Sequence, residues 1–490
     1  MRKIRGRSSE TFSKEPLKCF LLVAILMAFP VFYLSLSTTP PSQLTLLRQK
    51  NISGRKEITI SEGLTEFPRE IFDLADTLEV LDLKDNALSS LPDDLHRLHR
   101  LKILFLSSNK FTTIPQAVGN CKSISMMSFK SNQITRIEAL PPNIRWLTLT
   151  DNLIEELPSD MGRYTNLQKL LLAGNRLKSL PDTMRSCSQL ELMRISNNQL
   201  RELPPFISEL PKLAWIAFAG NPFTSEWESK IRDHDTKEVN WNELSIREKL
   251  GEGASGVVYR ADWKSKTDSE KKVAVKVYKG KMTSDGSPLN EMNAHMMSAG
   301  HPHITSLIGR VTRHPKGSKA IVMWLLNTKE WSKLARPPSM KSCTRDIYEE
   351  KMLSKVVLFR IMKGMASAMR FLHQKGIMHG DLYGHNIVYR LQAKKIHEEL
   401  SAEGQPMLVD FGAASLYDRS DRRMSQTLEG IEVRAWAILL DELMVLSDVE
   451  GEERRKLKGI RDLCLTSDEM IRPNFEQLEE KLRSFGKIES

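Results

Sequence analysis

A repeated pattern of leucine, asparagine and proline constrains the first half of this chain more than any other feature. The template L-x-x-L-x-L-x-x-N-x-L-x-x-L-P recurs seven times, in full or degenerate form, and its asparagines follow one another at steps of 23, 23, 20, 23, 23 and 23 residues. These asparagines are Asn86, Asn109, Asn132, Asn152, Asn175, Asn198 and Asn221. Each copy predicts one short strand whose alternate apolar residues face a shared core, so that no copy buries its own apolar face without a stacked neighbour.

The asparagine of each copy predicts a turn whose side-chain amide bonds to neighbouring backbone and builds a ladder between copies. The pattern resembles the leucine-rich repeat in its 23-residue form, which implies an α/β solenoid over residues 57–223. Ile58 to Pro68 resembles a degenerate N-terminal cap, and Asn221 to Phe223 resembles the last turn. The resemblance implies a concave surface that binds a partner, usually a protein; a purely structural role is the alternative.

The first fifty or so residues have the pattern of a targeting segment. Residues 1–18 form a basic tail with a net charge of +4, and residues 19–36 form an uncharged apolar run of 18 residues. As a helix this run would be roughly 27 Å long, enough to cross the core of a bilayer. We therefore predict a transmembrane or signal segment and a single-pass membrane protein. The alternative is a cleaved presequence that leaves the chain soluble in an organelle or secretory lumen.

Residues 37–56 are rich in Ser, Thr and Pro and predict a linker, with one glycosylation sequon at Asn51. Five scattered cysteines argue against a disulfide framework and against a zinc site, and they fit a reducing compartment better than the lumen that the N-terminus indicates. The net charge is +11, of which +4 lies in the basic tail. Because no motif interleaves basic and aromatic residues, we expect no binding of nucleic acid.

Chemistry begins after residue 244 with a glycine-rich loop. Gly251, Gly253, Gly256 and Val258 form the pattern G-x-G-x-x-G-x-V between two strand-like runs. Glycines let backbone N–H groups approach phosphates closely. A dinucleotide-binding loop of similar spacing leads into a helix, whereas residues 257–261 read as a strand. The loop is therefore predicted to be a phosphate lid at the turn of a hairpin.

Charged and amide side chains at fixed places follow this loop. Lys276 lies in an alternating strand, and Glu291 lies fifteen residues further on, in a predicted helix over 288–298. An ion pair between the two would hold the lysine toward the α- and β-phosphates of a nucleotide. Asp381, Asn386 and Asp410 lie at or near the ends of short predicted strands, and their oxygen atoms suit Mg²⁺.

The order of these motifs resembles a eukaryotic-type protein kinase domain of the tyrosine-kinase-like branch, over residues 244–486. The resemblance implies a bilobal α+β fold, ATP and Mg²⁺ as cofactors, and Asp381 and Lys276 as catalytic residues. Met323 takes the gatekeeper position. The implied nucleotide-binding residues are Leu250, Gly251, Glu252, Gly253, Gly256, Val258, Lys276 and Glu291, and the implied metal ligands are Asn386 and Asp410.

Several positions depart from the kinase pattern. The usual His-Arg-Asp is His379-Gly380-Asp381, which lacks the arginine that clamps an activation-loop phosphate. The activation loop is short and has no Ala-Pro-Glu, so we expect Glu429 to pair with Arg472 instead. Tyr383 replaces the catalytic-loop lysine of Ser/Thr kinases.

We predict a protein kinase that transfers the γ-phosphoryl group of ATP to a protein hydroxyl. Its strings HGDLYGHN, DFGAASLYD and LEGIEVRAW resemble a divergent group of leucine-rich-repeat kinases that are classed as Ser/Thr kinases. We expect the repeats to bind a protein partner or to present the substrate. The alternative is a catalytically weak pseudokinase scaffold that uses the repeats for protein binding.

Overall fold

The computed structural model of the chain describes most residues from Ser42 onward, and residues 43–490 belong to one compact unit. The described ranges are 42–229, 237–253, 255–265, 270–280, 282–327, 329–339, 345–349, 352–391, 394–396, 399–401, 403–468, 471–483 and 485. The predicted basic tail and apolar segment lie outside them. Within these ranges, no helix has the length and apolar character needed to cross a membrane.

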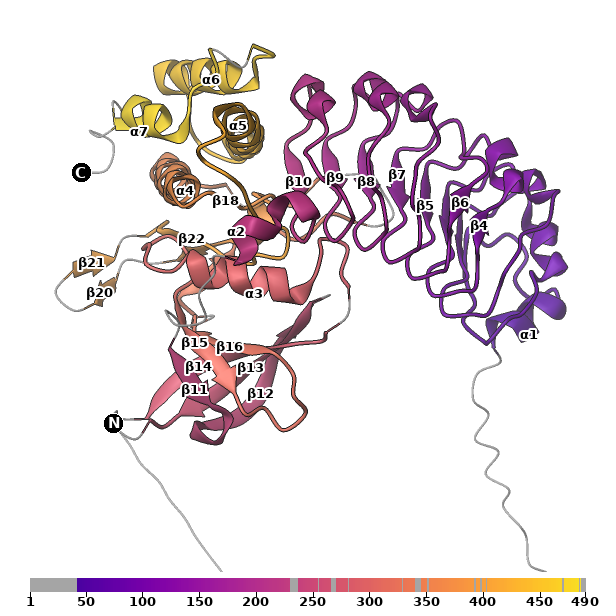
Figure 1. Cartoon of the computed structure of the whole chain (residues 1–490), viewed down its shortest axis with the longest axis horizontal. Coiled ribbons are helices and arrows are strands. Elements are labelled where there is room, and N and C mark those ends of the chain that lie inside the picture. Colours follow the sequence, from indigo (N-terminus) through magenta and orange to yellow (C-terminus); the bar gives the residue numbers. More distant parts are fainter. Residues whose placement is uncertain are drawn as a thin grey trace, which may run out of the picture. The chain divides into compact units, whose positions relative to one another are not determined.

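The repeats form one parallel sheet of eight short strands, in the order β1-β2-β3-β5-β7-β8-β9-β10. The strands are β1 (Glu57–Thr59), β2 (Val80–Asp82), β3 (Ile103–Phe105), β5 (Met126–Ser128), β7 (Trp146–Thr148), β8 (Lys169–Leu171), β9 (Leu192–Arg194) and β10 (Trp215–Ala217). A second pair joins β4 (Thr113–Ile114) to β6 (Arg136–Ile137). Short 3-10 turns return the chain between most strands on the opposite side of the solenoid (Figure 1). The predicted solenoid is confirmed.

The asparagine ladder has the predicted chemistry. Asn109 Nδ2 donates to the Leu83 carbonyl at 2.9 Å, and its Oδ1 accepts from the Leu88 N–H at 2.9 Å, both one repeat earlier. One feature was not predicted: the residue before every ladder asparagine has a positive φ, a conformation that Gly, Asn and Asp adopt most easily. These residues are Asp85, Ser108, Ser131, Asp151, Gly174, Asn197 and Gly220.

The predicted linker over residues 37–56 is structured from Gln43 onward. Helix α1 (Gln43–Arg48) precedes the first strand, and Leu47 and Ile52 are buried in the core of the repeats. Residues 57–59, which overlap the start of the predicted cap at Ile58, pair in parallel with β2, so the sheet begins there. The linker prediction failed because Ser, Thr and Pro outnumber the few apolar residues that dock this segment.

The N-terminal lobe of the second domain is a six-stranded sheet in the order β11-β15-β16-β14-β13-β12. Its strands are β11 (Glu238–Asn240), β12 (Leu244–Glu252), β13 (Gly256–Trp263), β14 (Lys271–Tyr278), β15 (Leu307–Thr312) and β16 (Ala320–Trp324). Helix α2 (Ser225–Ser229) precedes this sheet in the chain, and α3 (Pro288–Met297) lies beside it (Figure 1). The sheet thus begins at residue 238, six residues before the predicted domain boundary.

The C-terminal lobe is mainly helical, as the kinase resemblance implied. Its helices are α4 (Lys355–Gln374), α5 (Arg422–Val445), α6 (Gly451–Leu465) and α7 (Phe475–Arg483). Short strands position the loops: β17 (Trp331–Lys333), β18 (Ile377–Met378), β19 (Ile387–Arg390), β20 (Lys394–Ile396), β21 (Glu399–Ser401), β22 (Pro406–Leu408) and β23 (Ser415–Leu416).

The repeats and the C-terminal lobe share hydrophobic cores. The cluster that runs through the solenoid includes Ile216 and Phe218 of the last repeat together with four residues of the C-terminal lobe, Met378, Tyr417, Leu428 and Ile431. Arg434 of α5 donates to the carbonyl of Leu213 beside β10. The lobe therefore covers the open end of the solenoid, which sequence reasoning did not foresee.

Candidate active site

The glycine-rich segment is the predicted hairpin. Strands β12 and β13 pair antiparallel, with Glu252 opposite Val257 at the turn. A Cβ on Gly256 would lie 2.6 Å from the Val277 carbonyl oxygen, which explains the glycine, whereas Gly251 and Gly253 border open space. The hairpin therefore leaves its loop backbone free to approach a phosphate.

Other predicted nucleotide-binding residues line this hairpin. Val258 lies opposite Lys276 in the register of β13 and β14. Leu250 is 45% exposed near the end of β12. The carboxylate of Glu252 forms an ion pair with the ammonium group of Lys279 at 2.6 Å. The side chain of Glu252 therefore holds the glycine-rich loop against the residue that follows β14.

Lys276 and Glu291 form the predicted ion pair between β14 and α3. The Lys276 ammonium also lies 4.0 Å from Asp410 Oδ1. Burial disfavours the charged lysine, but Asp410 and Glu291 together raise the pKa of Lys276 above its ordinary value. The lysine is therefore a fixed cation at the base of the lobe, beside a carboxylate predicted to bind metal.

Asp381 and Asn386 are also brought together as predicted. Asn386 Nδ2 donates to Asp381 Oδ2 at 2.8 Å and to the Asp381 carbonyl at 3.0 Å. The amide nitrogen only donates hydrogen bonds, so the amide oxygen is the atom that Asn386 can offer to a cation. Asp410 keeps 51% of its side chain exposed, and the Gly412 N–H holds its Oδ1 at 3.0 Å. An amide oxygen and an exposed carboxylate are the ligand types that Mg²⁺ uses alongside phosphate oxygens.

Glu432 of α5 holds the catalytic loop, residues 379–386, in place. Its Oε1 accepts from the Gly380 N–H at 2.7 Å, and its Oε2 lies 2.7 Å from Nε2 of His373 on α4. His379 reaches in turn to the Asp410 carbonyl at 2.8 Å. These bonds join α4, α5, the catalytic loop and the segment that contains Asp410. The sequence did not reveal these contacts.

His295 of α3 is a site neighbour that sequence reasoning missed. Its ring stacks on Phe411 with centroids 4.8 Å apart, and its Nε2 lies 3.0 Å from the Thr305 carbonyl. Complete burial lowers the pKa of His295 to about 4, so the ring is neutral near pH 7. The stack links α3 to the residue that follows Asp410.

The last repeats reach the catalytic loop itself. Arg194 of β9 donates to Asp381 Oδ1 at 2.5 Å and to the Gly380 carbonyl at 3.1 Å. The Trp215 ring of β10 stacks on Tyr383 at 4.1 Å, and its indole N–H donates to the Leu382 carbonyl at 3.1 Å. Sequence reasoning missed both residues because each repeat was treated as a surface for other molecules.

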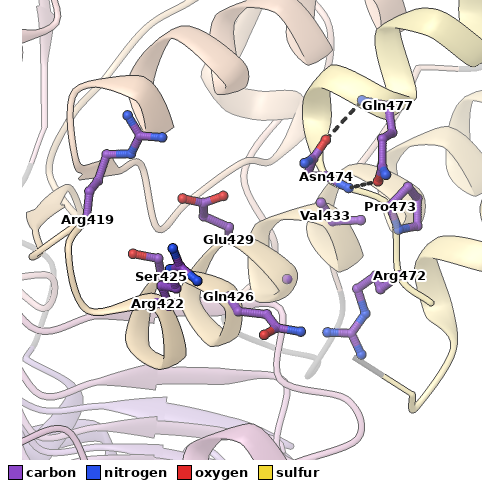
Figure 2. Close-up of a pocket in the computed structure, with 11 residues that line it drawn as sticks. Arg419, Arg422, Ser425, Gln426, Glu429, Val433, Arg472, Pro473, Asn474 and Gln477 are labelled. Carbon is purple, nitrogen blue, oxygen red and sulfur yellow. Dashed lines mark hydrogen bonds between the residues drawn. The ribbon is translucent and has the colours of Figure 1, made fainter. Parts of the chain in front are cut away.

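A pocket of about 370 Å³ lies between the start of α5 and the segment before α7, and Figure 2 shows its lining. Glu429 and Arg472, which were expected to pair, lie on different sides of it (Figure 2). Glu429 accepts from the Tyr417 hydroxyl at 2.9 Å, and Arg472 donates to the Thr466 carbonyl at 2.6 Å. Tyr417 thus holds the short activation loop against α5.

Comparison with known proteins agrees with this geometry. Residues 244–438 match the protein tyrosine and serine/threonine kinase family, and residues 58–111 and 142–200 match the leucine rich repeat family. The chain combines leucine-rich repeats with a protein kinase domain. The chain is 26% identical over 186 residues to serine/threonine-protein kinase pakH of Dictyostelium discoideum, a match that covers 37% of the chain and 31% of the relative.

Two further relatives are also named as serine/threonine kinases. Serine/threonine-protein kinase CTR1 of Arabidopsis thaliana is 27% identical over 294 residues, 51% of this chain and 32% of the relative. Serine/threonine-protein kinase mos of Xenopus laevis is 27% identical over 154 residues, 31% of this chain and 39% of the relative. The chain therefore spans well under half the length of these relatives.

Proposed function

We propose that this chain is a protein kinase that transfers the γ-phosphoryl group of ATP to a hydroxyl group of a protein. The observation that carries the proposal is the assembled Lys276–Glu291 pair, with Asp410 4.0 Å from the lysine and Asn386 bonded to Asp381. ATP bound with Mg²⁺ supplies the phosphoryl group and the cation that neutralises it. Lys276 would hold the α- and β-phosphates, and Asn386 and Asp410 would hold the metal.

Asp381 is the group that would accept the proton of the substrate hydroxyl. An ionised carboxylate has about four lone-pair sites, and Asn386 and Arg194 each use one. The side chain of Asp381 keeps 20% of its surface exposed, so a hydroxyl can reach it. Both neighbours fix the orientation of the carboxylate, and a proton acceptor has to be positioned in this way.

Serine and threonine are the proposed substrate residues. The relatives named above are serine/threonine kinases, which supports this choice. Tyr383 takes the place of the lysine that usually marks this specificity, so phosphoamino-acid analysis of the product is the direct check. For the repeats, we propose the role of a protein-binding surface that brings substrates or partners to the adjacent catalytic loop.

The experiment that tests the proposed activity compares the wild-type chain with Asp381→Asn on a generic protein substrate, with radiolabelled ATP. We expect the variant to lose about 10²-fold or more of the rate, since it lacks the proton acceptor. Asp160→Asn, a change of an exposed aspartate on the repeats, is the matched control and should leave the rate unchanged. Equal rates in wild type and Asp381→Asn would favour the pseudokinase alternative.

We also propose that residues 19–36 anchor the chain in a membrane. Asn51 of the sequon is exposed in the structure, so an oligosaccharyltransferase could reach it. Protease protection together with a glycan on Asn51 would support a lumenal domain on an intact anchor. A mature N-terminus after residue 37 would instead support the cleaved presequence.

A further inference from the structure

Arg194 is a buried cation that belongs to the repeats but bonds to the kinase domain. Its side chain is 2% exposed, and it lies at the end of β9. Nε donates to Asp285 Oδ1 at 2.7 Å, Nη1 to the Gly380 carbonyl, and Nη2 to Asp381 Oδ1. The guanidinium thus joins two carboxylates and one carbonyl of the kinase domain at fixed angles, which the planar fork of arginine suits and an ammonium does not.

The two carboxylates belong to different lobes. Asp381 is on the catalytic loop, whereas Asp285 lies in the turn that leads into α3. The Ser287 hydroxyl caps α3 by accepting from the Leu289 N–H at 3.2 Å, and the Ser287 N–H donates to Asn197 Oδ1 of the repeats at 2.9 Å. The start of α3 is therefore fastened to the solenoid at two neighbouring points, Arg194 and Asn197.

The position of α3 determines whether Glu291 reaches Lys276, because Glu291 lies in its first turn. A tie between the start of α3 and the catalytic loop therefore couples the lysine pair to the orientation of Asp381. In kinases with a His-Arg-Asp motif, an arginine at the position of Gly380 clamps a phosphate on the activation loop. Gly380 has no side chain to do so.

The contact is built into the fold, since the last repeat and the C-terminal lobe share a hydrophobic cluster around Leu428 and Ile431. Separating them would expose that cluster and would leave Asp285 and Asp381 without their cation. Exposing buried apolar side chains to water is unfavourable. This favours a permanent contact over one that opens to admit a substrate.

We propose that Arg194 is a positioning residue of the kinase active site, which ties the catalytic Asp381 to the start of α3 from within the repeats. The inference rests on the proposed kinase activity. Arg194 acts through Asp381 and Asp285, and it makes the lobe arrangement independent of a phosphate on the activation loop. The repeats are in this respect part of the catalytic domain.

The test measures kcat, the KM for ATP, binding of Mg·ATP and the melting temperature of the full chain carrying Arg194→Met. We expect kcat to fall about 10²-fold, as for a misplaced catalytic group, while Mg·ATP binding stays within about threefold. Arg345→Met is the control. Arg345 bridges Glu191 of the repeats at 3.2 Å and Glu442 of the C-terminal lobe at 4.0 Å. Among the residues that the structure describes, it makes no hydrogen bond to the catalytic loop, so its loss should leave kcat nearly unchanged.

Asp285→Asn provides a second variant that keeps the Arg194–Asp381 bond and weakens only the tie to α3. We expect its kcat to fall as well, and we expect the double variant Arg194→Met, Asp285→Asn to be no slower than Arg194→Met alone, because both changes break the same tie. Additive losses would contradict the proposal.

Three other results would overturn the proposal. An unchanged kcat in Arg194→Met would show that the tie is dispensable, and an increased kcat would show that Arg194 blocks the site. A parallel loss of Mg·ATP binding and melting temperature would show a purely structural role. Absence of activity in the wild-type chain, equal to that of Asp381→Asn, would be a failure of the proposed function instead, and the two failures are thereby distinguished.

Discussion

A β-carbon added to Gly380 would lie 2.4 Å from the carbonyl oxygen of Ile216. Gly380 also has a φ of +73°, and the same β-carbon would lie 2.7 Å from the Ala413 carbonyl oxygen. The position that holds an arginine in many kinases is thus filled here by the backbone of the last repeat. The absence of an arginine at position 380 therefore goes together with the packing of the solenoid against the catalytic loop.

Restoring the kinase arginine should therefore damage this protein. We expect Gly380→Arg and Gly380→Ala each to lower the free energy of unfolding by about 2 kcal/mol or more, because the side chain meets two carbonyl groups at a strained φ. Thermal unfolding of the full chain measures the loss. Gly459→Ala, where a β-carbon meets nothing within 4 Å on α6, is the control, and equal stability of Gly380→Ala and wild type would contradict the expectation.

The asparagine ladder predicts that removing a single side-chain amide lowers the free energy of unfolding substantially. Asn175 donates to the carbonyls of Leu149 and Leu172 at 2.9 Å and accepts from the Ile154 N–H at 3.1 Å, all buried. We expect Asn175→Ala to cost about 2–4 kcal/mol, since it leaves buried backbone groups without partners. Asn143→Ala, on an exposed asparagine, should cost well under 1 kcal/mol. Urea unfolding compares the two variants.

His295 predicts a loss of stability in acid. Its pKa is about 4 in the folded chain against an ordinary value of 6.5, so the unfolded chain binds the proton more readily between these values. Stability therefore falls as the pH falls from 6.5 toward 4, by about 2 kcal/mol between pH 7 and pH 5. Lys276 on β14 and His379 on the catalytic loop disfavour the charged ring further, and Asp410 opposes them.

Urea unfolding at pH 7 and pH 5 measures this term. His295→Gln keeps a donor for the Thr305 carbonyl but has no proton to gain, so its stability should depend less on pH than that of the wild type by about 2 kcal/mol over this range. The same pH dependence in both chains would show that other groups control it.

The contacts of Glu432 predict that its removal lowers the rate of phosphoryl transfer without weakening nucleotide binding. Its carboxylate accepts from the Gly380 N–H and from His373, and it touches none of the residues proposed to hold ATP. We expect Glu432→Ala to lower kcat about 10²-fold by releasing the catalytic loop, with Mg·ATP affinity nearly unchanged. Single-turnover kinetics and nucleotide titration check this. A weaker Mg·ATP affinity with an unchanged kcat would be the contrary result.

The fold was largely predictable from local pattern. The 23-residue spacing predicted the solenoid. Each asparagine bonds to the backbone of the preceding repeat, so a constant spacing repeats the same turn in each copy. The glycine-rich hairpin, Lys276 and the helix that carries Glu291 followed from spacing along the chain. Prediction failed at α1, where a few apolar residues such as Leu47 dock a segment of polar composition.

The candidate site was predictable only where its residues come from one domain. Lys276, Glu291, Asp381, Asn386 and Asp410 all lie within the kinase pattern, and the structure brings them together. Arg194 and Trp215 lie about 190 and 170 positions before their partners Asp381 and Tyr383, and no periodicity within one domain connects them. Contacts of this kind depend on how two surfaces fit, which a single sequence does not reveal.

Helix α5 closes the end of the solenoid, with Leu428 and Ile431 inside the repeat core. Many multidomain proteins are modular, so that a sensor can be exchanged between chains by joining it through a linker. Here an exchange would have to carry both halves of the junction, including the glycine at position 380. A substitution on one side of the junction is therefore expected to require a compensating substitution on the other side.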